Sequence, residues 1–182
     1  IEVCGPLRGG RVKVDGSISS QFITGLLLAL PRAEKDTTIE VSGAVSTPYI
    51  DMTLETIERF GVEIMYHEGD YSEFYVEGRQ QYRAVDYTIE SDWSAAAIIM
   101  VAAAIAGEVT IHNISTLSRQ ADTAICRALE RAGASLIIEE NSITVAHREL
   151  EAFTFDATQC PDLFPALVAL AAAADGVSTI YG

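Results

Sequence analysis

Positive charge is scarce in this sequence. Among its 182 residues, 12 Lys and Arg stand against 26 Asp and Glu, so the formal net charge is −14. Binding to nucleic acid needs a basic face that neutralises phosphates, and this balance argues against that class of partner. The two lysines are Lys13 and Lys35, and Lys13 lies with Arg8 and Arg11 just before a serine-rich stretch. The simplest interpretation of these three cations is a solvated face of a strand.

Cysteine, histidine and long apolar runs are also scarce. Cys4, Cys126 and Cys160 are odd in number and widely spaced, which predicts neither a disulfide framework nor a paired-cysteine metal site. The three histidines are scattered without ligand spacing, so we expect no metal. The longest apolar run, 95–106, has 12 residues and is too short to span a bilayer. We therefore expect a cytoplasmic protein without a membrane segment.

The most informative stretch that is present runs from Val14 to Phe22, with the sequence VDGSISSQF. It reads as a short strand, a tight turn and a serine-rich helix start. Hydroxyls, an amide and unpaired backbone N–H groups at a helix N-terminus favour binding of a phosphate. The alternative is that Ser17 or Ser19 only caps the helix. The Ser-Ser-Gln triplet at 19–21 is richer than a cap needs and favours a site.

An internal repeat predicts the architecture. The apolar fraction of 49% suffices for one large or two small cores. Period and alternation predict strands and helices in the order βαβαββ, and the order then recurs. The first copy is predicted at 11–15, 19–30, 37–42, 48–60, 62–66 and 73–77. The second copy is predicted at 87–90, 94–106, 108–113, 119–132, 134–138 and 142–146. A third copy is predicted to begin with a strand at 153–156, a helix at 162–174 and a strand at 177–181.

Landmarks support this alignment of the copies. Gly61 and Gly133 each follow the second helix of a copy, where a left-handed C-terminal cap is expected. The segment 95–106 is apolar on every side, which is typical of a helix buried among other elements. Such units cannot bury their helices alone, so we expect them to pack around one another.

With these motifs in view, the chain resembles the 5-enolpyruvylshikimate-3-phosphate synthase family. The residues that carry the resemblance are VDGSISSQF at 14–22, STPYIDMT at 46–53, FGV at 60–62 and Pro161-Asp162 before an apolar helix. The resemblance implies an α/β fold of repeated βαβαββ units in a two-lobed prism, with the substrate site between the lobes. It also implies that residues 1–89 are a unit of one lobe and that 90–182 are a unit, plus the start of another, of the second lobe.

The resemblance implies transfer of the enolpyruvyl group of phosphoenolpyruvate to the 5-hydroxyl of shikimate 3-phosphate, without a metal or organic cofactor, in a monomeric enzyme. Ser19, Ser20 and Ser46 would hold the substrate phosphate, and Gln21 would reach both substrates. The remaining implied residues are Tyr49 beside the substrate ring and Asp162 as the base for the hydroxyl proton. The residues themselves leave open that Tyr49 is a core aromatic and that Asp162 only complements a helix dipole.

Departures from the family pattern set a further expectation. The Lys-Ser pair and the later Arg, Lys, Glu and His residues through which the family handles phosphoenolpyruvate have no counterpart here. We therefore expect the chain to be an internal piece of a longer enzyme and to be inactive alone. Two other hypotheses remain open: a relative of the enolpyruvyl transferase that acts on UDP-N-acetylglucosamine, and a non-catalytic βαβαββ binding module. The Ser-Ser-Gln-Phe stretch at 19–22 argues against the first.

Overall fold

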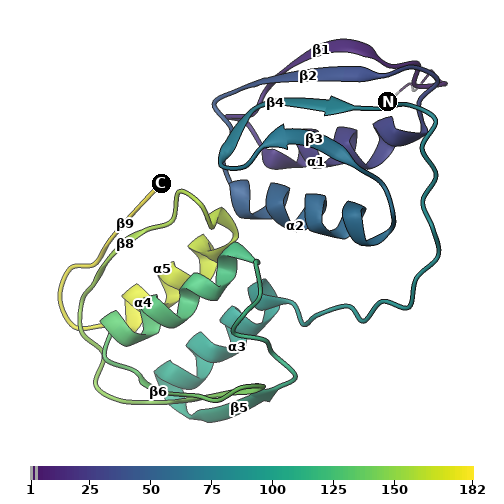
Figure 1. Ribbon diagram of the computed structural model, residues 1–182. Helices are drawn as coiled ribbons and strands as arrows, with labels where there is room; N and C mark the ends of the chain where they lie inside the picture. The colour runs from purple at the N-terminus through teal and green to yellow at the C-terminus, as the bar shows by residue number, and fades with distance from the viewer. Residues whose placement is uncertain (1, 3) are drawn as a thin grey trace. The chain divides into compact units, whose positions relative to one another are not determined.

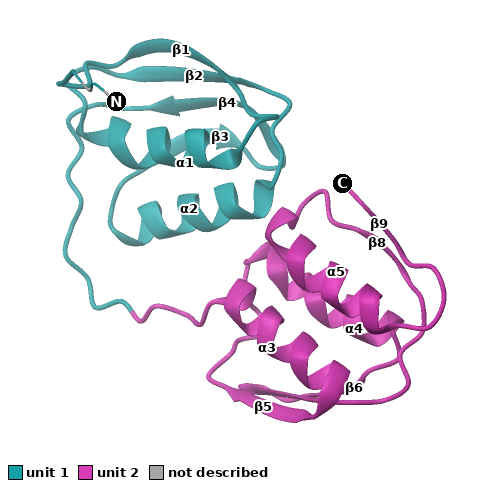
Figure 2. Cartoon of the chain, turned by 180° about the vertical axis from the view of Figure 1, so that it is seen from behind, with its two compact units in different colours: residues 1–87 teal, residues 88–182 magenta. Residues whose placement is uncertain are grey.

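The computed structural model describes residue 2 and residues 4–182. These residues form two compact units, which divide between Tyr87 and Thr88 (Figure 2). The connecting segment is held by the first unit as far as Tyr87, whose ring centroid lies 5.7 Å from that of Phe60. From Ser91 the chain is held by the second unit, because the Ser91 hydroxyl donates to the Asn113 carbonyl.

The first unit is a four-stranded sheet with two helices on one face (Figure 1). Its strand order is β1-β2-β4-β3; β1 and β2 are parallel, and β4 is antiparallel to both of its neighbours. The elements along the chain are β1 (Gly10–Asp15), α1 (Ser20–Ala29), the 3₁₀ turn η1 (Leu30–Arg32), β2 (Thr37–Ser42), α2 (Thr47–Arg59), β3 (Ile64–His67) and β4 (Asp70–Val76). This is the βαβαββ order that the sequence predicted.

Apolar side chains at helical and strand spacing build the core of this unit. Ile23 and Leu27 of α1, four residues apart, are fully buried, and so are Ile39 of β2 and Phe74 of β4. At about 25 cal/mol per Å² of apolar surface, each such side chain contributes roughly 1.5–3 kcal/mol to stability. Both helices therefore lie over the same face of the sheet (Figure 1), and their N-termini lie at one edge because each helix follows one of the parallel strands β1 and β2.

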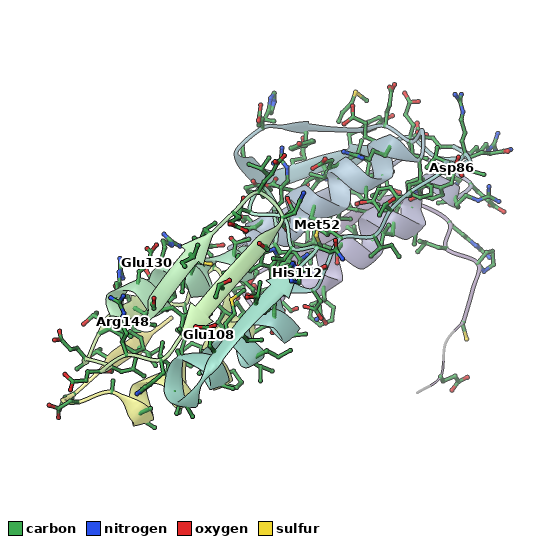
Figure 3. All side chains as sticks on the ribbon, turned by 90° about the horizontal axis from the view of Figure 1, so that it is seen from below. Met52, Asp86, Glu108, His112, Glu130 and Arg148 are labelled. Carbon is green, nitrogen blue, oxygen red and sulfur yellow. The ribbon has the colours of Figure 1, made fainter. Side chains whose placement is uncertain are left out.

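The second unit contains α3 (Trp93–Ala106), β5 (Glu108–His112), the 3₁₀ turn η2 (Ala121–Ala124), α4 (Ile125–Arg131), β6 (Ser135–Ile138), β7 (Ser142–Ala146), β8 (Thr154–Asp156), the 3₁₀ turn η3 (Pro161–Leu163), α5 (Phe164–Ala173) and β9 (Thr179–Tyr181). Its two sheets have the orders β5-β7-β6, antiparallel, and β8-β9, parallel. The three helices lie between them (Figure 1). In Figure 3 the labelled Glu108 and His112 mark the two ends of β5.

One predicted strand is wrong. Residues 87–90 alternate in polarity, yet they form no strand, and the Ile89 side chain is 84% exposed. A strand needs a partner for its backbone hydrogen bonds. The matching strand of the first unit, β1, pairs with β2, whereas β5 pairs with β7 and with no other strand of the described residues.

Two predicted helices are shorter than expected, for identifiable reasons. The helix predicted at 119–132 begins later because Gln120 has non-helical backbone angles, φ −59° and ψ 126°. Its side-chain amide accepts from Trp93 N at 2.9 Å and donates to Ser91 O at 2.8 Å. The helix predicted at 162–174 begins as the turn η3 and becomes α5 only at Phe164. Phe164 N donates to Pro161 O, the bond of a 3₁₀ turn, and Pro165 has no N–H with which to form the α-helical bond to the same carbonyl.

Candidate functional site

Glycine at position 16 brings two loops together at the edge of the first sheet. One loop follows β1 and leads into α1, and the other follows β2 and leads into α2. Gly16 N donates to Ser42 O at 2.8 Å, and Val45 N donates to Gly16 O at 3.3 Å. A Cβ atom on Gly16 would lie 2.9 Å from the Cα of Ala44, so only glycine allows this approach. Because β1 and β2 are parallel neighbours, the N-termini of α1 and α2 meet at one place.

The serines before α1 have different local partners. The Asp15 carboxylate accepts from the Ser17 N–H at 3.0 Å and from its hydroxyl at 2.6 Å, which holds the pKa of Asp15 below its usual range. Ser19 is the N-cap, and its Oγ accepts from Gln21 N at 3.2 Å. Of the two candidate caps, Ser19 is therefore the one that caps α1. Its own hydroxyl proton is not used in that bond, so capping leaves Ser19 able to donate to an anion.

The next two residues complete the first turn of α1. Ser20 is the first helical residue and is 6% exposed, and Gln21 beside it is exposed. The first N–H groups of an α-helix have no partner within the helix, and together they carry a partial positive charge. This end of α1 therefore combines hydroxyls, backbone donors and a favourable field for a phosphate.

The loop before α2 contributes a buried serine with an unusual backbone. Ser46 is 6% exposed and is the N-cap of α2, with φ 53° and ψ 42° in the left-handed region. Its side chain makes no capping hydrogen bond, while its carbonyl accepts from Tyr49 N at 3.1 Å. Tyr49 is half-buried and is not among the fully buried residues of the core.

Two cations of β1 form ion pairs with an acidic side chain of the neighbouring strand. Arg11 and Lys13 both form ion pairs with Glu40 of the neighbouring strand, the second with an Nζ–Oε2 distance of 3.2 Å. These contacts hold the pKa of Glu40 below its usual range. The backbone N–H groups at the two helix ends supply a positive field that does not depend on Arg11 or Lys13.

Asp162, the predicted base, lies in the second unit. It is exposed in the turn η3, which contacts α3 and precedes α5. The structure thus brings Ser19, Ser20, Gln21, Ser46 and Tyr49 to one edge of the first unit. Among the described residues, no group of three or more His, Cys, Asp or Glu could hold a metal ion. No helix in the described part of the chain is both long and apolar enough to cross a bilayer.

Comparison with known proteins identifies the family of this chain. The model of the EPSP synthase (3-phosphoshikimate 1-carboxyvinyltransferase) family matches residues 1–182. The chain belongs to this family. It is 40% identical over 182 residues to the 3-phosphoshikimate 1-carboxyvinyltransferase of Clostridium perfringens, covering 99% of this chain and 42% of that protein. It is 41% identical over 184 residues to that of Methanosarcina acetivorans, covering 98% of this chain and 43% of that protein.

Solved structures confirm the predicted α/β fold class. EPSP synthase from Acinetobacter baumannii aligns with a TM-score of 0.70 at 24% identity, over 96% of this chain and 41% of that one. The enolpyruvyl transferase NikO from Streptomyces tendae aligns with a TM-score of 0.70 at 17% identity, over 93% of this chain and 43% of that one. The chain thus spans about two fifths of the length of the EPSP synthase family members that it matches.

Proposed function

We propose that the full-length protein containing this chain transfers the enolpyruvyl group of phosphoenolpyruvate to the 5-hydroxyl of shikimate 3-phosphate and releases phosphate. Membership of the EPSP synthase family supports the reaction. The observation that best supports the site is the close approach of the N-termini of α1 and α2 at Gly16, with serine at the start of each helix. Residues 1–89 and 90–182 would belong to different lobes of that protein.

Each residue at this edge has a role that suits its chemistry. Ser19 and Ser20 donate hydroxyl hydrogen bonds to the 3-phosphate, and Ser46 donates to the same group from the neighbouring helix. Gln21, exposed beside them, reaches both substrates, and Tyr49 packs against the substrate ring. Hydrogen bonds to a charged group contribute about 1.5–3 kcal/mol each, so three serines contribute substantially to the recognition of a phosphate.

Asp162 takes the hydroxyl proton in this proposal. The substrate oxygen then forms a bond to C2 of phosphoenolpyruvate, while the methylene carbon gains a proton from an acid. Loss of a proton from that carbon and departure of phosphate restore the double bond, so no electrons are gained or lost and no cofactor is needed. An exposed carboxylate at the start of a helix can approach a substrate hydroxyl to within about 3 Å, as a general base must.

Phosphate release by the full-length protein with both substrates tests the proposal. We expect turnover by the full-length protein and background release by the 182-residue chain alone, since the chain spans only 42% of a relative's length. Asp162→Ala should reduce turnover by about 10²–10⁴-fold and leave affinity for shikimate 3-phosphate nearly unchanged. The double variant Ser19→Ala/Ser20→Ala should weaken that affinity by roughly 1.5–3 kcal/mol for each lost bond.

Other outcomes would favour the alternatives. Turnover with UDP-N-acetylglucosamine in place of shikimate 3-phosphate would indicate the related transferase. Absence of binding heat with shikimate 3-phosphate in calorimetry would indicate a non-catalytic module. More than about a tenth of wild-type turnover in Asp162→Ala would indicate that Asp162 has a purely structural role.

We further propose that the protein is a cytoplasmic monomer. Its free cysteines, Cys4, Cys126 and Cys160, suit a reducing compartment.

A further inference from the structure

The left-handed backbone of Ser46 needs an external support. A residue with a Cβ atom at φ 53° is strained, and such conformations persist only where the surrounding structure holds them. Serine is not among the residues that favour this region. The strain lies at the N-cap of α2, directly before its first residue, so whatever fixes the first turns of α2 also fixes the direction of the Ser46 side chain.

A hydrogen bond from Tyr71 of β4 connects the first turns of α2 to the sheet. The Tyr71 hydroxyl donates to Asp51 of α2, with distances of 2.8 Å to Oδ1 and 3.0 Å to Oδ2. Hydrogen bonding from the Thr47 side chain acts on the same phenol and lowers its pKa. Thr47 and Asp51 are four residues apart and therefore lie on one face of α2. Desolvation and the Asp51 contact raise the pKa of Tyr71 to about 12, so the hydroxyl remains a donor at neutral pH.

The position of Tyr71 along the sheet places its hydrogen bond to Asp51 near the candidate site. Tyr75, four residues later on β4, pairs with Thr38 near the beginning of β2. Because β4 is antiparallel to β2, Tyr71 lies toward the end of β2 from which the loop to α2 departs. A shift of register between β3 and β4 after Tyr66 accompanies the turn of Tyr71 toward the helix, as bulges re-aim side chains.

From these contacts we infer that Tyr71 and Asp51 are positioning residues that hold Ser46 in its strained, phosphate-facing conformation. The inference rests on the proposed function, in which Ser46 contacts the 3-phosphate of the substrate. Neither residue touches the substrate itself. The hydrogen bond between Tyr71 and Asp51 supplies the support that a serine in the left-handed region requires. Its loss would allow the loop to relax to an ordinary backbone conformation.

A pair of tyrosine variants in the full-length enzyme tests this inference. Tyr71→Phe removes the hydroxyl and keeps the ring. Tyr75→Phe is the matched control, because Tyr75 is on the same strand and its hydroxyl donates to Asp36 Oδ2 at 2.9 Å, away from the loop. We expect Tyr71→Phe to raise the dissociation constant and KM for shikimate 3-phosphate by about five- to tenfold, with kcat and KM for phosphoenolpyruvate nearly unchanged. Tyr75→Phe should change neither.

Two substitutions of Asp51 distinguish loss of the hydrogen bond from loss of folding. Asp51→Asn keeps an oxygen that accepts from Tyr71, so it should affect affinity less than Asp51→Ala; equal effects of these two would overturn the inference. So would a wild-type affinity in Tyr71→Phe, or equal losses in both tyrosine variants. Failure of the proposed function is distinguishable, because Ser19→Ala/Ser20→Ala would then also leave the affinity for shikimate 3-phosphate unchanged.

Discussion

Replacement of Gly16 by alanine tests how tightly the two loops of the candidate site are packed. The added Cβ atom would lie 2.9 Å from Ala44 Cα, 2.9 Å from Val41 Cγ1 and 3.2 Å from Ala44 N. Two of these three atoms belong to the backbone, which cannot rotate away as a flexible side chain can. The loops must separate, and the hydrogen bonds of Gly16 to Ser42 and Val45 must lengthen.

The cost follows from these contacts. Overpacking a well-packed region by one methyl group costs about 1–3 kcal/mol, and two weakened backbone hydrogen bonds favour the upper half of that range. We expect Gly16→Ala to lower the free energy of unfolding of the first unit by roughly 2–3 kcal/mol. Urea denaturation of the 182-residue chain, followed by circular dichroism, measures this change.

Gly25 supplies the matched control. It lies inside α1, is exposed, and a Cβ atom there would meet nothing within 4 Å. Alanine is a better helix former than glycine, so Gly25→Ala should raise the free energy of unfolding by about 0.5–1 kcal/mol. If Gly16→Ala proved as stable as the wild type, the close approach of the loops, and with it the geometry of the candidate site, would be refuted.

Two predictions concern the second unit. Asp92 caps α3 by accepting from two N–H groups of the first turn, so Asp92→Ala should lower the free energy of unfolding by about 1 kcal/mol in a urea titration, and an unchanged midpoint would contradict this. Burial raises the pKa of both Cys126 and Cys160 to about 11. At pH 8 these thiols should therefore react with a disulfide reagent far more slowly than exposed Cys4, a difference that unfolding abolishes.

Local signals predicted most of the secondary structure. The strands Thr37–Ser42 and Ser142–Ala146 have the predicted bounds, and Gly61 and Gly133 have the left-handed φ values of 80° and 85° expected of helix caps. These features depend on residues next to one another in the sequence: alternation for a strand, and a missing Cβ for a cap. The same reasoning failed at 87–90, because alternation says nothing about whether a neighbouring strand is present.

The sequence alone determined the repeat, the serine-rich start of α1 and the family, since all three are patterns along the chain. Tertiary structure decided how these parts become a candidate site. Ser46 carries no local signal for a left-handed backbone, and the contact of Tyr71 with Asp51 joins residues 20 positions apart. Such features arise when β1 and β2 pair and α2 docks on the sheet, because packing can hold strained or distant groups that no local preference selects.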